Sequence, residues 1–409
     1  MKHLLLFTVV MMLLASCSSD EPGGKAQNIN LSRSEQEILD AQKDFSVNFF
    51  KSVYASEDAK KNILVSPLSM SMAFSMVANG AEGETLAEIT RALGFSSGEL
   101  EEVNNLNKTL LRRLPSMDSG TTVAIANSVW ANEGELFNSD FSKTVAGDYN
   151  AESQSVDLYS ESGMHAINEW ANSKTNGMVP KVLDEPLKAL FAICNSLYFE
   201  GKWSVEFDPE KTRRESFNNA DGSTSQVYMM HQSTELECYF ENLNGDQSRE
   251  EGRQVIRKSY GAGAYLMTLV LPSVNETLSE MVNSIDATTL RSWESRLSDR
   301  QIYLGIPRFE YEYGRDDFKD QMCALGIVKA FQPDAELPAI LQHGVMLDKV
   351  IQKSKIKVDE SGAKVATTTV VSGIDIGQPR SVTFDRPFMY YISEQSTGAI
   401  LFMGCVNAF

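Results

Sequence analysis

The stretch that organises this chain is Lys357-Val-Asp-Glu-Ser-Gly-Ala-Lys-Val-Ala-Thr-Thr-Thr-Val-Val-Ser-Gly-Ile-Asp-Ile-Gly-Gln-Pro-Arg380. Its alternate positions from 363 to 371 read Ala, Val, Thr, Thr, Val. A small, largely apolar face with a period of two is typical of a strand that is buried on one side. The same stretch contains Gly373 and Gly377 and runs into Pro379, as an exposed loop does. Taken alone, it also fits a surface hairpin strand.

The end of the chain carries a second pattern, which is Phe384-Asp-Arg-Pro-Phe-Met-Tyr-Tyr-Ile392 followed by Thr397-Gly-Ala-Ile-Leu-Phe-Met-Gly-Cys-Val-Asn-Ala-Phe409. These residues resemble the C-terminal signature of the serpin family. The resemblance implies an α+β fold in packed layers, the serpin fold, with three β-sheets, about eight or nine helices and an exposed reactive-centre loop. In this family the loop lies between a Glu-x-Gly hinge and the Phe-x-x-Pro-Phe block.

The resemblance also implies a mechanism. A target protease cleaves the loop, whose N-terminal part then inserts into the main sheet as a new central strand and traps the acyl-enzyme. The protein is then an irreversible suicide-substrate inhibitor and not an enzyme. The hinge residues that must insert are Glu360, Gly362, Ala363, Val365, Ala366 and Thr367. Lys364 falls on the opposite face of that strand, where it can point to solvent. The alternative is a non-inhibitory serpin acting as a carrier or chaperone, a type whose hinges carry bulky, charged or proline residues.

The family's usual loop length, counted from Glu360, places the reactive bond at Ile376–Gly377. An apolar, β-branched residue before the bond fits a shallow hydrophobic pocket. The expected targets are therefore elastase-like or subtilisin-like serine proteases, with a papain-like cysteine protease as a further candidate. Asp375 would suit an aspartate-selective protease, and Arg380 a trypsin-like one.

Five further residues resemble the family's shutter and breach, the regions where the main sheet opens. They are Ser66, Ser69, Asn195, Trp203 and Gln352. Many members carry a histidine where this chain has Gln352, and that histidine bonds to the shutter asparagine. Glutamine can donate and accept in the same place, but it cannot titrate near neutral pH. Helix capping by Ser66, with Pro67 as first helical residue, and core burial of Asn195 and Trp203 explain the same residues without a gating role.

Residues 1–16 have the pattern of a signal peptide, because an apolar run follows Lys2 and His3 and is too short to span a bilayer as a mature helix. The run ends Leu14-Ala-Ser-Cys17, which resembles a bacterial lipobox with Cys17 as the lipidated N-terminus. We expect residues 17–33 to be a flexible tether and residues 34–409 to form the serpin domain, with a capping box at Ser34 and Glu37. The protein would then be lipid-anchored to the cell envelope, at the outer membrane, and an acidic pair in the tether faintly resembles a surface-export signal.

Composition limits the partners. The formal net charge of −18 argues against nucleic acid, heparin-like polyanions and anionic membrane surfaces, so the membrane contact expected is the N-terminal lipid alone. The 5 cysteines have no paired spacing, so neither a disulfide framework nor a metal site is expected, and no cofactor is expected. None of the 4 histidines lies in a catalytic motif. The expected partner is a protease, bound by a monomer.

Overall fold

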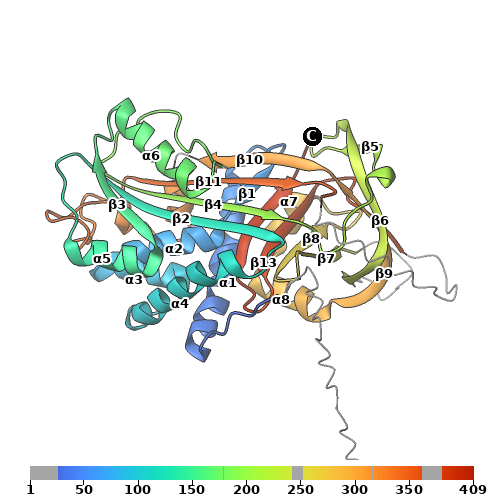
Figure 1. The fold of residues 1–409 in the computed structure, drawn as a ribbon, viewed down its shortest axis with the longest axis horizontal. Coiled ribbons are helices and arrows are strands. Elements are labelled where there is room, and N and C mark those ends of the chain that lie inside the picture. Colours follow the sequence, from blue (N-terminus) through green and yellow to red (C-terminus); the bar gives the residue numbers. More distant parts are fainter. Residues whose placement is uncertain (1–25, 178, 242–251, 316, 362–379) are drawn as a thin grey trace, which may run out of the picture.

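The computed structural model describes residues 26–177, 179–241, 252–315, 317–361 and 380–409 (Figure 1). Several residues singled out from the sequence lie outside these ranges. They are Cys17, Gly362, Ala363, Val365, Ala366, Thr367, Asp375, Ile376 and Gly377. Glu360 and the shutter and breach residues lie within them.

A five-stranded sheet runs across the molecule in the order β10-β11-β4-β2-β3 (Figure 1). Its central strands β2 and β4 are largely buried, which agrees with the near-continuous apolar run in β4. Strands β11 and β4 are parallel neighbours, whereas β10 with β11 and β2 with β4 are antiparallel. The strands are β2 (Thr121–Asn132), β3 (Ala151–Val156), β4 (Phe191–Gly201), β10 (Phe309–Arg315) and β11 (Lys349–Val358).

The remaining strands form one hydrogen-bonded array of nine, in the order β1-β14-β13-β8-β7-β6-β9-β12, with β5 paired to β6. The 17-residue β6 pairs with β5 and β9 and, at its end, with β7. This shared strand joins two of the three expected sheets into one array. The strands are β1 (Ile63–Val65), β5 (Arg213–Asn218), β6 (Thr224–Phe240), β7 (Gln254–Tyr260), β8 (Tyr265–Leu271), β9 (Ser298–Pro307), β12 (Arg380–Thr383), β13 (Phe388–Glu394) and β14 (Ile400–Val406).

The described residues form nine α-helices, which agrees with the expected number. They are α1 (Arg33–Ser56), α2 (Pro67–Ala78), α3 (Gly83–Leu93), α4 (Leu100–Arg113), α5 (Ser139–Tyr149), α6 (Glu161–Lys174), α7 (Leu278–Ser284), α8 (Ala287–Arg296) and α9 (Lys319–Ala324). No helix among the described residues is long and apolar enough to cross a membrane.

The first helix corrects one expectation. Its capping box is formed by Ser32 and Glu35 and not by Ser34 and Glu37. Both serines are followed three residues later by a glutamate, so the local pattern fits either register. The buried side chain of Ile29 and its amide, which donates to the Ser396 hydroxyl at 2.9 Å, hold the chain just before Ser32.

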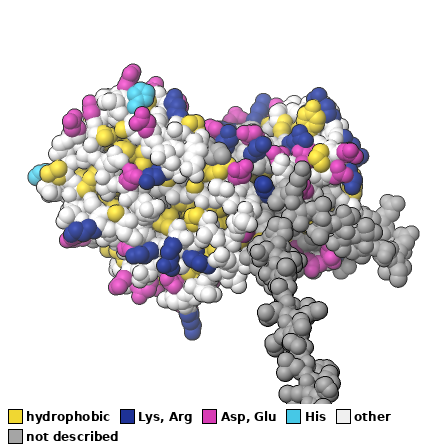
Figure 2. Space-filling model, in the orientation of Figure 1, with side chains coloured by type: hydrophobic (Ala, Val, Ile, Leu, Met, Phe, Trp, Pro, Cys, Tyr) yellow, Lys and Arg dark blue, Asp and Glu magenta, His cyan; other side chains and the backbone are white. Residues whose placement is uncertain are grey.

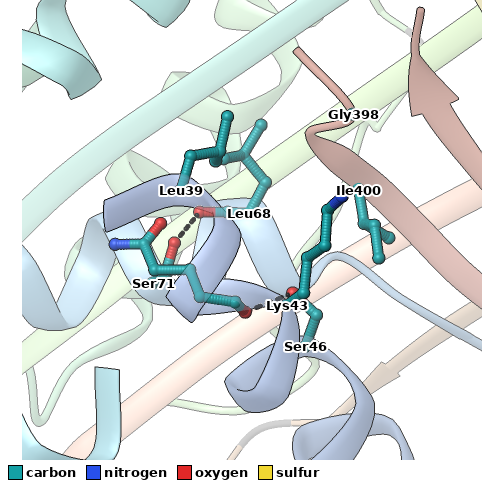
Figure 3. Close-up of a pocket in the computed structure, with 8 residues that line it drawn as sticks. Leu39, Lys43, Ser46, Leu68, Ser71, Gly398 and Ile400 are labelled. Carbon is teal, nitrogen blue, oxygen red and sulfur yellow. Dashed lines mark hydrogen bonds between the residues drawn. The ribbon is translucent and has the colours of Figure 1, made fainter. Parts of the chain in front are cut away.

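Helix α2 is buried along its whole length and packs between β4 and β14. Ser66 is its N-cap, accepting from the Ser69 amide at 3.2 Å, and Pro67 is its first residue, as the sequence predicts. A cavity of about 10 Å³, the space of one water molecule, lies where α1, α2 and the start of β14 meet (Figure 3). Gln42 lines it, and both polar atoms of the Gln42 amide lack a partner among the described residues.

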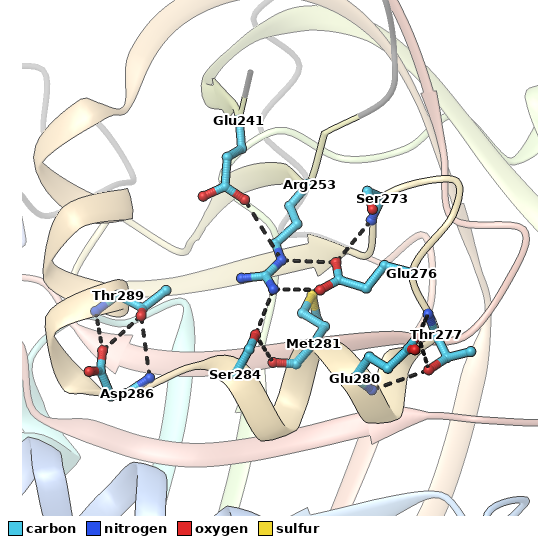
Figure 4. Close-up of polar contacts among 10 residues, drawn as sticks. All are labelled: Glu241, Arg253, Ser273, Glu276, Thr277, Glu280, Met281, Ser284, Asp286 and Thr289. Carbon is cyan, nitrogen blue, oxygen red and sulfur yellow. Dashed lines mark hydrogen bonds and ion pairs between the residues drawn. The ribbon is translucent and has the colours of Figure 1, made fainter. Parts of the chain in front are cut away.

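Arg253 fixes the loop between β8 and α7 against the ends of β6 and β7 (Figure 4). Its guanidinium donates to both carboxylate oxygens of Glu276, at 2.9 and 2.5 Å, and to the Ser284 hydroxyl at 2.6 Å. The Arg253 carbonyl accepts from the Glu241 amide at 2.8 Å. A bidentate hydrogen bond between an arginine and a carboxylate is among the stronger polar interactions in proteins. Arg253 therefore links the start of β7 to the loop before α7 and to the last residue of α7.

Candidate functional site

The parallel pair β11 and β4 is where a strand can be added to the five-stranded sheet. The two strands pair from Lys349 with Ala192 to Lys355 with Tyr198. Beyond that point β11 continues against β10 as far as Val358, and β4 continues against β2 as far as Gly201. Within the described residues, the two strands are thus not paired with each other at the end where the chain leaves β11. A segment that turns back from β11 would run antiparallel to both strands, which suits a ladder on each side.

Gln352 lies opposite Asn195 in this pair, but its side chain bonds elsewhere. Its amide nitrogen donates to the Ser66 carbonyl at 2.9 Å, and its amide oxygen accepts from the Ser66 amide at 2.8 Å. The expected bond to Asn195 is not among the contacts that the structure shows. A glutamine amide carries a donor and an acceptor side by side, so it matches the two backbone groups of one residue. Gln352 therefore attaches the centre of β11 to the start of α2.

Asn195, also expected at the shutter, is bonded to the neighbouring strand β2. Its amide nitrogen donates to the side-chain oxygen of Asn127 at 2.5 Å, and the Asn127 amide nitrogen donates to the Tyr149 carbonyl at 3.0 Å. Asn127 faces Asn195 across β2 and β4, so the chain of bonds runs from β4 through β2 to the end of α5. The sequence reasoning did not single out Asn127. The signal was a polar pair, Asn127 and Ser128, within an otherwise apolar buried run of β2.

Trp203 is the residue expected at the breach. Its indole nitrogen donates to the Asp359 carbonyl at 2.9 Å, and its ring stacks on Tyr260 with centroids 4.3 Å apart. The Trp203 side chain is buried. Trp203 therefore holds the backbone of Asp359, the residue that directly precedes Glu360.

The hinge residue Glu360 is buried and anchored at its carboxylate. Arg308 donates to it from Nε at 2.5 Å and forms an ion pair with it, and the Thr212 hydroxyl donates at 2.5 Å. Burial alone would raise the pKa of Glu360, but these bonds outweigh it and hold the pKa below its ordinary value. A groove of about 480 Å³ opens beside this pair, between Pro209 and the end of β11. Arg308 and Thr212 were not identified from the sequence, because nothing local marks them as partners of a residue so distant along the chain.

Arg380, the rival site for cleavage, is the first residue of β12 and pairs with Ile302 of β9. Its guanidinium carbon lies 3.9 Å from the centroid of the Phe240 ring. In this arrangement the Arg380 side chain packs on β6 and is only partly exposed. The Arg380 side chain therefore contacts Phe240 within the fold.

A family model described as "Serpin (serine protease inhibitor)" matches residues 40–408. The chain belongs to the serpin family. Human neuroserpin is 31% identical over 373 residues, covering 89% of this chain and 90% of neuroserpin. The native state of the thermophilic serpin tengpin superimposes with a TM-score of 0.81 at 27% identity and covers 95% of this chain. The match extends over 97% of tengpin.

Human thyroxine-binding globulin has a TM-score of 0.80 at 25% identity, over 92% of this serpin and 100% of that protein. The same fold thus also serves a protein whose name describes ligand binding. The expected serpin fold is confirmed. Serpins act mostly as inhibitors of proteases and not as catalysts.

Proposed function

We propose that this serpin is an irreversible suicide-substrate inhibitor of a protease. Cleavage at Ile376–Gly377 would free the segment after Glu360 to insert between β11 and β4. The observation that carries the proposal is the divergence of these two parallel strands beyond Lys355 and Tyr198. The hinge sequence supports it, because Ala363, Val365 and Thr367 give the inserted strand a small, largely apolar face.

The driving force would come from the new strand. About fourteen inserted residues, at roughly 3.3 Å each, reach about 45–50 Å, which is the order of the sheet's length. Each new ladder hydrogen bond contributes about 0.5–1.5 kcal/mol net. An intact loop is tethered at both ends and cannot insert fully, so the native state would be held kinetically. Cutting one bond removes that restraint.

The apolar Ile376 suits elastase-like or subtilisin-like serine proteases, with a papain-like cysteine protease as a further candidate. Mass spectrometry of the peptide released on reaction with an elastase-type enzyme tests the position of the bond. A fragment that begins at Gly377 is expected. A fragment that begins at Ser381 would move the cleaved bond to Arg380 and change the target class to trypsin-like enzymes.

Ala363→Arg tests the insertion step, because it places a charge without a partner on the buried face of the new strand. We expect this variant to be cleaved as a substrate without forming an SDS-resistant complex. Lys364→Arg is the matched control, since it keeps a charge on the opposite face. An Ala363→Arg variant that traps the protease as well as the parent does would overturn the insertion mechanism.

A carrier or chaperone role is the second candidate, favoured by the likeness to thyroxine-binding globulin. Cleavage of the loop near Ile376 distinguishes the inhibitor from the carrier or chaperone. Insertion adds a strand and is expected to raise the melting temperature substantially, whereas a loop that cannot insert leaves the melting curve unchanged.

We also propose that Cys17 carries a lipid that anchors the protein to the cell envelope, at the outer membrane. The run Leu14-Ala-Ser-Cys17 supports this. On the face shown in Figure 2, basic and acidic side chains are interspersed, which supports a lipid and not a polyanionic surface as the membrane contact. Metabolic labelling with a radioactive fatty acid should mark the parent and not Cys17→Ala. Labelling of both would refute the lipid site.

A further inference from the structure

Lys258 of β7 lies beneath the breach with its ammonium group buried. The residue is 2% exposed, although lysine is one of the residue types most often found at the surface. Its Nζ donates to the Val205 carbonyl at 2.6 Å and to the side-chain oxygen of Gln232 at 2.8 Å. Val205 follows Trp203 in the chain, and Gln232 lies in β6. One ammonium group therefore connects β7, β6 and the segment that carries Trp203.

The same ammonium faces two aromatic rings. Its Nζ lies 5.2 Å from the centroid of Trp203 and 4.8 Å from the centroid of Phe207. A cation at this distance is attracted by the negative face of a ring, and more strongly where water is excluded. The Trp203 indole in turn donates to the Asp359 carbonyl. A continuous set of contacts thus runs from Lys258 through Trp203 to the residue before the hinge Glu360.

Neighbouring groups on β7 and β8 do not neutralise this charge. Arg257 is adjacent in β7, points to the other face of the strand and forms an ion pair with Glu237 at 3.6 Å. Met267, opposite Lys258 in β8, is uncharged. Tyr260 is neutral at ordinary pH, because burial raises its pKa well above the usual value.

Groups on β6 and on the segment after Trp203 do not neutralise the charge of Lys258 either. His231, next to Gln232 in β6, bonds through its ring to Glu215 of β5 at 2.9 Å. Glu206 follows Val205, and one of its carboxylate oxygens is buried without a hydrogen-bond partner in the described part of the chain. Within that part, no carboxylate lies within 4.0 Å of the Lys258 Nζ. Burial without a counter-charge lowers the pKa of Lys258 to about 7, so its charge changes near neutral pH.

We propose that Lys258 is a positioning residue for loop insertion, whose ammonium group fixes Trp203 against Asp359 and releases it when the proton is lost. The neutral amine retains N–H donors for Val205 and Gln232, but it loses the attraction to the two rings and the strength that a charge gives to its hydrogen bonds. The breach would then open more easily above neutral pH. Loop insertion would be slower on the acid side, on the order of tenfold between about pH 6 and pH 8.5. This inference rests on the proposed inhibitory function.

The first test uses no protease and measures tryptophan emission of the full chain from about pH 6 to pH 8.5. The parent should show a transition near pH 7, the pKa that burial gives Lys258. The transition should be absent in Lys258→Met, which has a similar length and no charge, and in Lys258→Arg, which keeps its charge throughout. The chain has 4 tryptophans that emit. Trp203→Phe should also lack the transition, because it removes the tryptophan whose ring faces the Lys258 ammonium group. Lys202→Met, an exposed neighbour, should retain it.

The second test measures the rate at which an SDS-resistant complex with an elastase-type protease forms at the same pH values. The parent should form the complex faster above pH 7 than below it, and the rate for Lys258→Met should not change with pH in this way. Circular dichroism checks that each variant is folded. A parent emission curve without a transition, or one that persists in Lys258→Met, would overturn the assignment of Lys258. Failure of the parent to form a complex at any pH would instead refute the proposed inhibitory function, and the emission curves would still decide whether Lys258 positions Trp203.

Discussion

Gln352 and Ser66 form a closed pair, in which the glutamine side chain donates to the Ser66 carbonyl and accepts from the Ser66 amide, at 2.9 and 2.8 Å. Ser66 is the N-cap of α2, and Gln352 lies at the centre of β11. The pair therefore connects α2 to the strand that would separate from β4 in the proposed insertion. It makes this connection without a titratable group.

Gln352→Ala should lower the free energy of unfolding by about 1–3 kcal/mol, because it leaves the buried Ser66 amide without its acceptor and removes one of the two donors to the Ser66 carbonyl, which keeps the Met70 amide. Urea unfolding measures the loss. Gln301→Ala is the matched control, since Gln301 lies exposed in β9 and its replacement should change stability by less than about 0.5 kcal/mol. Equal effects of the two substitutions would mean that the pair contributes nothing specific.

Asn127→Ala should also destabilise the native state. It removes the acceptor of the Asn195 amide and the donor to the Tyr149 carbonyl, both of which are buried. We expect a loss of about 1–3 kcal/mol on urea unfolding, together with faster loss of inhibitory activity on storage as the strands separate. Asn218→Ala, in the exposed strand β5, is the control. A stable Asn127→Ala protein would show that Asn195 finds another partner.

The sequence identified both residues of the Ser66–Ser69 and Gln352–Ser66 contacts, but one residue and not its partner in the contacts of Asn195 and Glu360. Ser66 was predicted as a cap because its bond to Ser69 is local, and Trp203 was placed at the breach by a string of adjacent residues. Asn127 and Lys258 contribute from strands far along the chain, and Arg308 from the residue between β9 and β10. At such positions the neighbouring residues do not reveal what a side chain will touch.

Two expectations differ from the structure, the residue that caps the first helix and the partner of the Gln352 side chain. Both differences arise from contacts distant in the sequence. The choice of Ser32 over Ser34 as the first cap depends on packing upstream, at Ile29, and not on the cap pattern itself. Gln352 was expected to bond to Asn195 because many serpins carry at this position a histidine that bonds to the shutter asparagine. The two residues do lie opposite each other in β11 and β4. The direction of the Gln352 side chain depends instead on which backbone groups of α2 need partners, and a sequence does not display these.

Arg308→Met should lower stability by about 1–3 kcal/mol at neutral pH, because it leaves the Glu360 carboxylate buried with Thr212 as its remaining side-chain donor. Adding Glu360→Gln should recover part of this loss, and a double-mutant cycle gives the coupling between the two residues. Arg33→Met is the control, since Arg33 and Glu37 form a fully exposed pair with little effect on stability. A coupling energy of zero would show that the hinge is not anchored through Arg308.

The same pair predicts a pH dependence. The pKa of Glu360 is lowered in the folded state from 4.5, so the unfolded chain binds the proton more tightly. The stability contributed by the pair is therefore fully present above pH 4.5 and is lost as the pH falls through the folded-state pKa. The difference in unfolding free energy between the parent and Arg308→Met should shrink in that acid range. A difference that stays constant would contradict the ion pair.

Lys258 predicts a dependence of the same sign, but in a higher pH range. Burial lowers its pKa from 10.5 to about 7, so between these values the folded protein has released a proton that the unfolded chain retains. Unfolding then takes up a proton, and stability rises with pH across this window. Below about pH 7 both states are charged, and the folded state bears the whole cost of the buried ammonium group.

Lys258→Met removes the titrating group, so the parent should gain stability relative to this variant from about pH 7 to pH 10, as measured by urea unfolding. Lys202→Met, which alters an exposed lysine, should follow the parent across the same range. Parallel curves for the parent and Lys258→Met would show that Lys258 titrates as an ordinary surface lysine and that the ammonium group is not excluded from water.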